Sequence, residues 1–303
     1  MVNNSNKIRV IGLGQASLDY LGRAPFFPEE DSKTELIDLY SQCGGPVSTA
    51  LVTLSRLGVS SSFIGSISDD IFGVEIMKGL KAEKIDTTYL KITRGYTSQV
   101  AFIAISKTSG NRNIFWRRGT APFLSADEVD LSPFQDADIL HLDGLMIEAS
   151  IEAAKQAKRL GIKIVYDAGT MRDGSEELAE MADILIASEK FAEPITGPGA
   201  LPENALKALM KLCPGDVVIT LGAKGSIGFF QGSIIQQEAF PVKAVDTTGA
   251  GDVYHGAYIY GLLHGWDMPE CMQFASAAAA LKCKEIGAQK GIPKLSNIIK
   301  LIS

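Results

Sequence analysis

Short apolar runs alternate with stretches of helical periodicity over most of the chain. Residues 7–14 are rich in β-branched side chains and end in glycines, which predicts a buried strand. Residues 46–58 begin with proline and end with glycine, which is typical of a helix. After residue 121, strand and helix patterns follow each other regularly. This alternation predicts a mostly parallel sheet covered by helices on both faces.

Two stretches interrupt the alternation. Residues 15–42 show no long helical period, and residues 88–121 contain strand patterns without a helix. We expect these two excursions to pair in space as one small sheet, a lid over the large domain. Parallel sheets bind ligands beyond the carboxyl ends of their strands. The candidate loops therefore follow Gly14, Gly144, Asp167, Ser188 and Gly222.

The stretch DTTGAGDVYHG, residues 246–256, places small residues directly before an acid and an apolar helical segment. The first N–H groups of a helix have no intrahelical partner and carry partial positive charge. Gly249, Ala250 and Gly251 would let an anion approach these groups closely. Asp252 then has two interpretations, an ordinary helix cap or a base that accepts a proton from an attacking hydroxyl. The residues alone leave both open.

Composition and other motifs narrow the function. The 303 residues are 46% hydrophobic, which is enough for one large domain. The net charge of -6 disfavours nucleic acid as a partner, and no run of 18 apolar residues predicts a membrane span. No signal peptide is recognisable, and the four cysteines form no CxxC pair, so we expect a cytoplasmic protein. GLGQAS lacks the third glycine of a dinucleotide fingerprint, and no GKS or GKT occurs.

The segment DTTGAGDVYHGA closely resembles the C-terminal signature of the ribokinase-like (PfkB-type) carbohydrate kinases. GGPVSTALVTLSRLG, residues 44–58, resembles their N-terminal signature, and the order of the elements agrees over nearly the whole chain. The resemblance implies one kinase chain, residues 1–303, with a three-layer α/β/α domain, a mostly parallel sheet and a small β-sheet lid. It also implies transfer of the γ-phosphate of ATP to a sugar hydroxyl, with Mg²⁺ as a cofactor.

Individual roles follow from the resemblance alone. Asp252 would be the catalytic base, and Gly249, Ala250 and Gly251 would form the anion hole for the transferred phosphate. Asp19 would accept hydrogen bonds from sugar hydroxyls. The other implied sugar-binding positions are Gly44, Gly45 and Thr49, and the implied nucleotide-binding positions are Ser188, Thr220, Gly222, Gly225, Ser276 and Cys283. A monovalent-cation site, for K⁺ in some members, is implied at Asp246 and Thr248 with backbone carbonyls near Lys282, Glu285, Gly287 and Gly291.

Departures from the family pattern point to a branch within it. Thr49 stands where an asparagine is usual, so the sugar contacts differ. The usual Asn-x-x-Glu is replaced by residues 188–191, which removes the magnesium-orienting acid from its normal place. Thr49 and the segment 274–292 look similar to the branch with ketohexokinase and sulfofructose kinase. This predicts a ketose or an anionic ketose derivative, whose charged group Arg112 and Arg117 of the lid would meet.

Some alternatives remain open at this point. A nucleoside kinase of the same fold would share the base and the anion hole, and a non-catalytic sugar or nucleotide sensor would explain the altered residues 188–191. Lids of this type commonly pair across a dimer, which predicts a homodimer through the lid. His141, His255 and His264 have no partner at metal-ligand spacing, so we expect them to pack or to cap.

Overall fold

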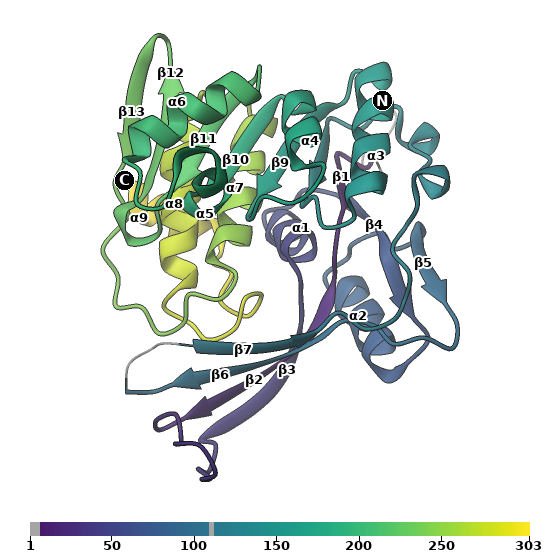
Figure 1. Cartoon of the computed structure of the whole chain (residues 1–303), viewed down its shortest axis with the longest axis vertical. Coiled ribbons are helices and arrows are strands. Elements are labelled where there is room, and N and C mark those ends of the chain that lie inside the picture. The colour runs from purple at the N-terminus through teal and green to yellow at the C-terminus, as the bar shows by residue number, and fades with distance from the viewer. Residues whose placement is uncertain (1–6, 109–111) are drawn as a thin grey trace.

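One large twisted sheet organises the molecule (Figure 1). The computed structural model describes residues 7–108 and 112–303. Within this part of the chain nine strands follow in the order β13-β12-β11-β10-β9-β8-β1-β4-β5. Seven neighbouring strands of this sheet run parallel, namely β11, β10, β9, β8, β1, β4 and β5. The remaining two, β12 and β13, are antiparallel at one edge. Their bounds are β1 (Val10–Leu13), β4 (Ser61–Ser68), β5 (Leu90–Thr93), β8 (Ile139–Leu142), β9 (Lys163–Ala168), β10 (Ile184–Ser188), β11 (Asp216–Thr220), β12 (Ser226–Phe230) and β13 (Ser233–Gln237).

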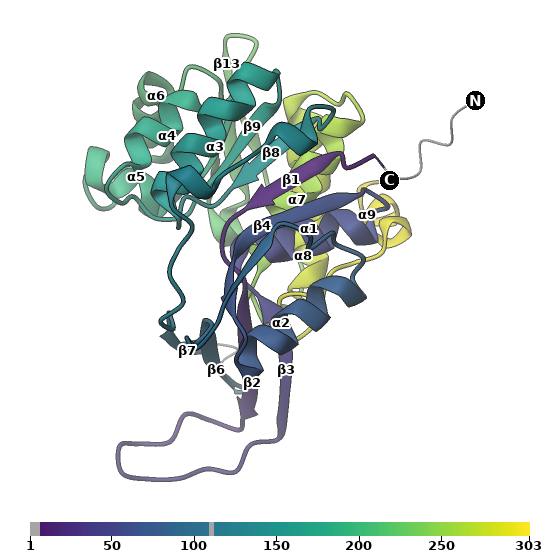
Figure 2. The ribbon, with the colours of Figure 1, turned by 90° about the vertical axis from the view of Figure 1, so that its right-hand side faces the viewer.

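Helices cover both faces of this sheet, as Figure 2 shows. Successive strand residues point to opposite sides, so Val10 and Ile11 of β1 belong to different cores. The first face carries α1 (Pro46–Arg56), α2 (Ile71–Ala82), α7 (Ala250–Leu263), α8 (Met268–Lys282) and α9 (Leu295–Ile302). The second carries α3 (Ile147–Leu160), α4 (Ser175–Met181), α5 (Glu189–Thr196) and α6 (Pro202–Leu212). The three layers predicted from the sequence are confirmed.

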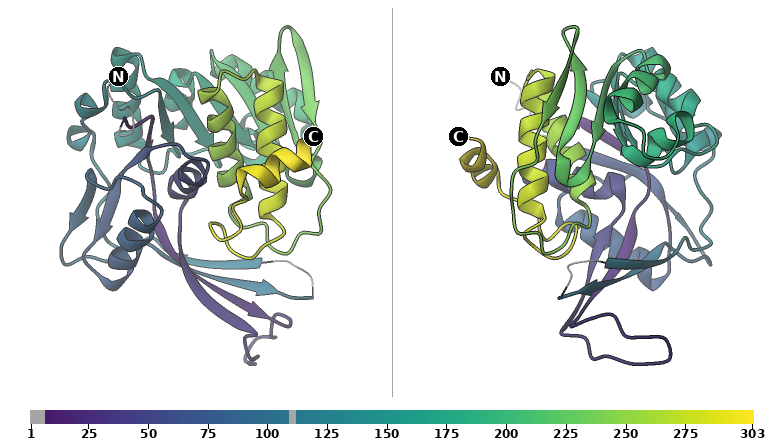
Figure 3. Two further views of the ribbon diagram at one scale, coloured as in Figure 1. Left: turned by 180° about the vertical axis from the view of Figure 1, so that it is seen from behind. Right: turned by 60° about the vertical axis from the view of Figure 1, so that its left-hand side comes forward.

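A second, smaller sheet projects from the large domain (Figure 3). Its order is β3-β2-β6-β7, with β2 (Ser17–Ala24), β3 (Asp38–Gly44), β6 (Val100–Ser106) and β7 (Arg112–Arg117). Each of the two excursions supplies two strands, and we call this sheet the lid. The range 88–121 is wrong in one respect, because β5 pairs with β4 in the large sheet. Leu90 of β5 is buried in the core of the large domain, which draws this strand away from the lid.

Two further expectations concern membranes and thiols. Among the described residues no helix is both long and apolar enough to span a membrane. The thiols of Cys43, Cys213, Cys271 and Cys283 are free. The cysteines therefore do not form a disulfide framework.

The sheet order places a topological switch point at β1, and we call the region beyond the carboxyl ends of β1, β8 and β9 the crevice. β1 lies between β4 and β8, although β8 follows it by more than 120 residues. From the carboxyl end of β1 the chain passes directly into the lid. Gly14 follows β1, Asp143 follows β8, and Asp167 lies near the end of the adjacent β9. Ligands of open parallel sheets bind at such a switch point.

Candidate active site

The N-terminus of α7 forms one wall of this crevice. Gly249 precedes the helix with a φ of 74°, a left-handed conformation that favours glycine. The first i→i−4 bond runs from the N–H of Val253 to the carbonyl of Gly249. The N–H groups of Gly251 and Asp252 precede the regular ladder, and that of Ala250 donates to the Thr247 carbonyl at 3.2 Å. A Cβ on Gly251 would meet no atom within 4 Å, so the space in front of this turn is open.

A pocket of about 460 Å³ opens beside this turn. Its size falls in the usual range for small-molecule sites. Five of the six residues predicted for the nucleotide line it, namely Thr220, Gly222, Gly225, Ser276 and Cys283, together with Ala250 and Gly251. The sixth, Ser188, is not part of the lining. It pairs with Thr220 across β10 and β11, and its hydroxyl donates to the carbonyl of Gly169 at 2.7 Å.

Three carboxylates act on Asp252 from the side away from this pocket. Asp19 comes from β2, Asp143 follows β8, and Asp167 lies on β9; all three are buried. Burial, followed by the negative charge of Asp167, raises the pKa of Asp252 from 3.8 to about 7. Burial likewise raises the pKa of Asp143 to about 7 and that of Asp19 to about 6. This part of the crevice can therefore accept protons near neutral pH.

His255 partly balances this negative charge. Its Nδ1 lies 2.7 Å from the Asp167 carboxylate. Burial lowers the pKa of His255, but the Asp167 carboxylate outweighs burial, and the net pKa is raised. Burial lowers the pKa of the neighbouring His141 to about 4, which keeps that ring neutral at pH 7. His255 therefore packs against the His141 and Tyr254 rings and in addition pairs with Asp167, whereas His264 caps α7, with Nδ1 2.8 Å from the Tyr260 carbonyl oxygen.

Asp143 and Asp167 were not singled out in the sequence as site residues. Each stands at the end of one of two neighbouring parallel strands. The sequence signal available for them was their position at predicted strand ends, where ligands bind. His255 carried no such signal, because its partner Asp167 is 88 positions away along the chain.

The predicted sugar-binding residues lie at the junction of the lid and α1. The Ser17 hydroxyl donates to Asp19 at 2.7 Å. A Cβ on Gly44 would collide with the Asp19 carboxylate, and one on Gly45, whose φ is 100°, would collide with the Gln15 carbonyl. Both positions therefore require glycine. Thr49 is fully buried, and its hydroxyl has no hydrogen-bond partner among the described residues. Buried polar atoms normally have a partner, so this hydroxyl is an exception.

The lid arginines take different positions. Arg112 of β7 donates to the hydroxyl of Thr247, two residues before Gly249. Arg117 is exposed at the end of β7, opposite Val100. The guanidinium of Arg118 lies over the Phe123 ring, 4.1 Å from its centroid, as in cation–π pairs. Arg112 therefore reaches residues 246–251, which we call the signature loop, whereas Arg117 lies at the other end of β7.

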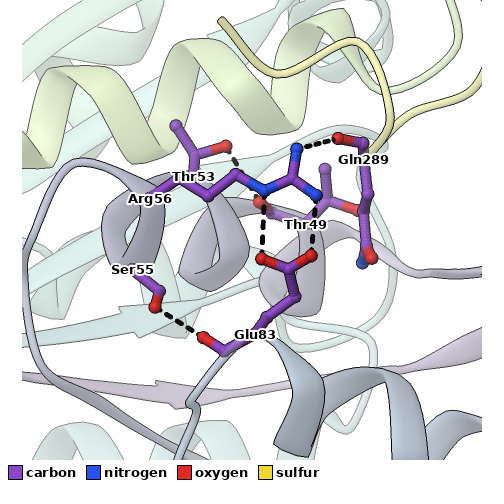
Figure 4. Close-up of polar contacts among 6 residues, drawn as sticks. All are labelled: Thr49, Thr53, Ser55, Arg56, Glu83 and Gln289. Atoms are coloured by element: carbon purple, nitrogen blue, oxygen red, sulfur yellow. Dashed lines mark hydrogen bonds and ion pairs between the residues drawn. The ribbon is translucent and has the colours of Figure 1, made fainter. Parts of the chain in front are cut away.

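The residues predicted for a monovalent cation form a connected network. The Asp246 carboxylate accepts hydrogen bonds from the N–H and the hydroxyl of Thr248, at 2.9 and 2.7 Å, and from the N–H of Gly287 at 2.8 Å. Arg56, the last residue of α1, contacts Gln289, which lies two residues after Gly287 (Figure 4). It donates to the Gln289 carbonyl at 2.6 Å and pairs with both carboxylate oxygens of Glu83.

Comparison with known proteins decides the family. The model of the pfkB family carbohydrate kinases matches residues 7–295. The chain belongs to this family. It is 30% identical over 300 residues to a ribokinase of Haemophilus influenzae, covering 96% of this chain and 97% of the relative. It is 28% identical over 313 residues to a 5-dehydro-2-deoxygluconokinase of Shouchella clausii, covering 97% and 95%.

The kinase also matches solved structures over its whole length. A structure of Arabidopsis thaliana ribokinase complexed with ribose and ATP has a TM-score of 0.82 and 26% identity, and the match covers 98% of this chain and 99% of that one. The predicted ribokinase-like fold and the assignment as a phosphotransferase are thereby confirmed.

The magnesium-orienting acid expected in the family is absent from its usual place. Phe191 occupies that position and is fully buried in the core beneath α5. An apolar side chain offers no oxygen ligand, so it cannot hold Mg²⁺. Glu189 is exposed at the start of α5. Residues 188–191 therefore do not fit the family's usual arrangement for this ion.

Proposed function

We propose that this kinase transfers the γ-phosphate of ATP to a hydroxyl of a ketose or an anionic ketose derivative. One observation carries the proposal, namely the position of Asp252 between two sites. On one side, Ala250 and Gly251 line the 460 Å³ pocket. On the other, the charge of Asp19 acts on Asp252 and contributes to its raised pKa. A hydroxyl held by Asp19 and a phosphate held at the start of α7 would meet at this residue.

The chemistry follows from this position. Asp252 takes the proton of the sugar hydroxyl as its oxygen attacks the γ-phosphorus. The new O–P bond forms while the bond to the ADP oxygen breaks, and the electron pair leaves with ADP. The N–H groups at Gly249–Gly251 stabilise the negative charge on the transferred phosphate. A base with a pKa of about 7 is suited to this step, because a substantial fraction of it is ionised at neutral pH and it still accepts a proton readily. Mg²⁺ would enter with the phosphates of ATP.

The charges of the crevice support the substrate class. Asp19, Asp143 and Asp167 are hydrogen-bond acceptors suited to sugar hydroxyls. An anionic group on the substrate would be repelled there and would turn towards the lid, where Arg112 and Arg117 lie. The relatives named 5-dehydro-2-deoxygluconokinase support this class, because that name denotes a keto sugar acid.

A homodimer through the lid is part of the proposal. Leu39, Phe115 and Trp116 of the lid are 59%, 63% and 65% exposed. Large exposed apolar side chains on the two edge strands, β3 and β7, favour cover by a partner, and a second copy of the lid is the partner we propose. Light scattering of the wild type and of Trp116→Glu tests this. A monomeric wild type at micromolar concentration would refute it.

A substrate panel tests the activity. The purified protein is incubated with ATP and, in turn, ketoses, keto sugar acids, aldoses and nucleosides, and ADP release is measured. We expect turnover with a ketose or its anionic derivative. Turnover of adenosine alone would establish the nucleoside kinase instead. Saturable binding of sugar and ATP without any turnover would establish the sensor.

A further inference from the structure

The kinase carries a buried lysine beside its anion hole. Lys282 is the last residue of α8 and is fully buried. Its Nζ donates to the backbone carbonyl of Asp246 at 2.8 Å and lies 3.9 Å from the Asp246 carboxylate. A buried ammonium group is costly unless it is paired, so this position reflects a specific demand for positive charge.

Nζ contacts Asp246, one of the residues implied for the monovalent cation, and other implied residues lie together close by. A Cβ placed on Gly291 would lie 2.8 Å from the carbonyl oxygen of Lys282 and 3.3 Å from that of Gly287. The carbonyl oxygens of Lys282 and Gly287 therefore both lie near Gly291, and the N–H of Gly287 donates to the Asp246 carboxylate. Rings of backbone carbonyls are the usual way in which proteins replace the hydration shell of K⁺.

The ammonium group and a K⁺ ion do not fit this place together. Asp246 is one of the implied ligand residues, and its carbonyl already accepts a hydrogen bond from Nζ. An ion bound to the same oxygen would lie within a few ångströms of a second positive charge, and like charges repel strongly in a buried site. At Asp246, the ammonium group thus takes a contact that a K⁺ ion would need.

We propose that the Lys282 ammonium group permanently replaces the monovalent cation and holds the anion hole in shape. Asp246 is three residues before Gly249, and its carboxylate orients the turn through Thr248. The N–H groups of Val245 and Asp246 donate to the Cys283 carbonyl, which joins this turn to the end of α8. Lys282 therefore ties the signature loop to α8 without an ion. As far as turnover is concerned, this inference rests on the proposed function.

Three variants test the proposal in KCl and in choline chloride of equal ionic strength. Lys282→Ala removes the charge and opens the space, Lys282→Met removes the charge and keeps the space filled, and Lys284→Ala removes an exposed charge two residues away. Thermal unfolding of the purified full chain is the first measurement, because it does not depend on turnover. Phosphorylation of the substrate found in the panel is the second.

We expect the wild type and Lys284→Ala to behave alike in the two salts. Lys282→Ala should unfold earlier in choline chloride and be stabilised selectively by K⁺, since an ion that binds only the folded state raises its stability. Its turnover should fall about tenfold or more in choline and recover in KCl, as expected when an element of an anion hole is disordered and restored. Lys282→Met should lose turnover in both salts.

K⁺-specific stabilisation or activation of the wild type would overturn the proposal. Equal unfolding of Lys282→Ala in the two salts would also overturn it. If Lys282→Ala does not fold in either salt, the comparison of the wild type in KCl and choline chloride still decides. If no substrate is turned over, the proposed function fails while the unfolding data still test Lys282.

Discussion

Replacing Asp252 by asparagine should abolish catalysis and yet stabilise the fold. The substitution keeps the shape of the side chain and removes its charge. Burial and the charge of Asp167 raise the pKa of Asp252 from 3.8 to about 7. The folded protein therefore holds a carboxylate that the unfolded chain ionises more readily. This penalty is absent below about pH 3.8, grows as the pH rises, and is complete above about pH 7.

The size of the effect follows from the shift. A difference of one pKa unit corresponds to about 1.4 kcal/mol, so the upper limit is about 4 kcal/mol. Asparagine still loses water from its amide and no longer attracts the charge of His255. We therefore expect a net gain of about 1–2 kcal/mol in the free energy of unfolding at pH 8. Phosphoryl transfer should fall by about 10²–10⁴-fold because the positioned base is lost.

Urea unfolding at pH 8 and pH 5 measures this gain. The advantage of Asp252→Asn over the wild type should be smaller at pH 5, where Asp252 is largely protonated in the fold. Glu203→Gln is a matched control, since Glu203 is an exposed acid in the first turn of α6. A variant less stable than the wild type at pH 8, or an equal gain at both pH values, would refute the electrostatic reasoning. Wild-type turnover by Asp252→Asn would refute its role as base.

Three further predictions concern the two binding sides and the pH profile. The kcat/KM for the sugar should rise between about pH 6 and pH 8 and then level off, because only the ionised form of Asp252 accepts a proton; a flat profile over this range would contradict the assignment. Asp19→Ala should raise the KM for the sugar about 10–100-fold and leave the KM for ATP nearly unchanged, since a charged hydrogen-bond acceptor is lost on one side only; equal changes in both constants would argue against sugar binding by Asp19. Ala279→Phe should fill the pocket beside Cys283 and weaken ATP binding about tenfold or more, with the sugar KM unaffected; titration of a fluorescent ATP analogue measures this, and unchanged affinity would place the nucleotide elsewhere.

Much of the fold could be predicted from local pattern. The 3.6-residue and two-residue periods depend on neighbours along the chain, so the helices and most strands were recognisable. The family resemblance rests on a continuous signature around Asp252, which includes the glycines that shape the start of α7. The sequence pattern places β5 in the lid, because a short strand pattern does not say which sheet the strand joins. Only the burial of Leu90 against the large domain decided that.

Side-chain encounters between distant segments were decided by the tertiary structure. Asp143 and Asp167 meet Asp252 because β8 and β9 are neighbours in the sheet and α7 begins beyond their ends. The pKa values of this cluster depend on burial and mutual charge, which no local pattern contains. The position of Lys282 is the clearest case. The sequence shows only a basic residue near the end of a helix. Its contact with Asp246, 36 positions away, exists because α8 folds back onto the signature loop.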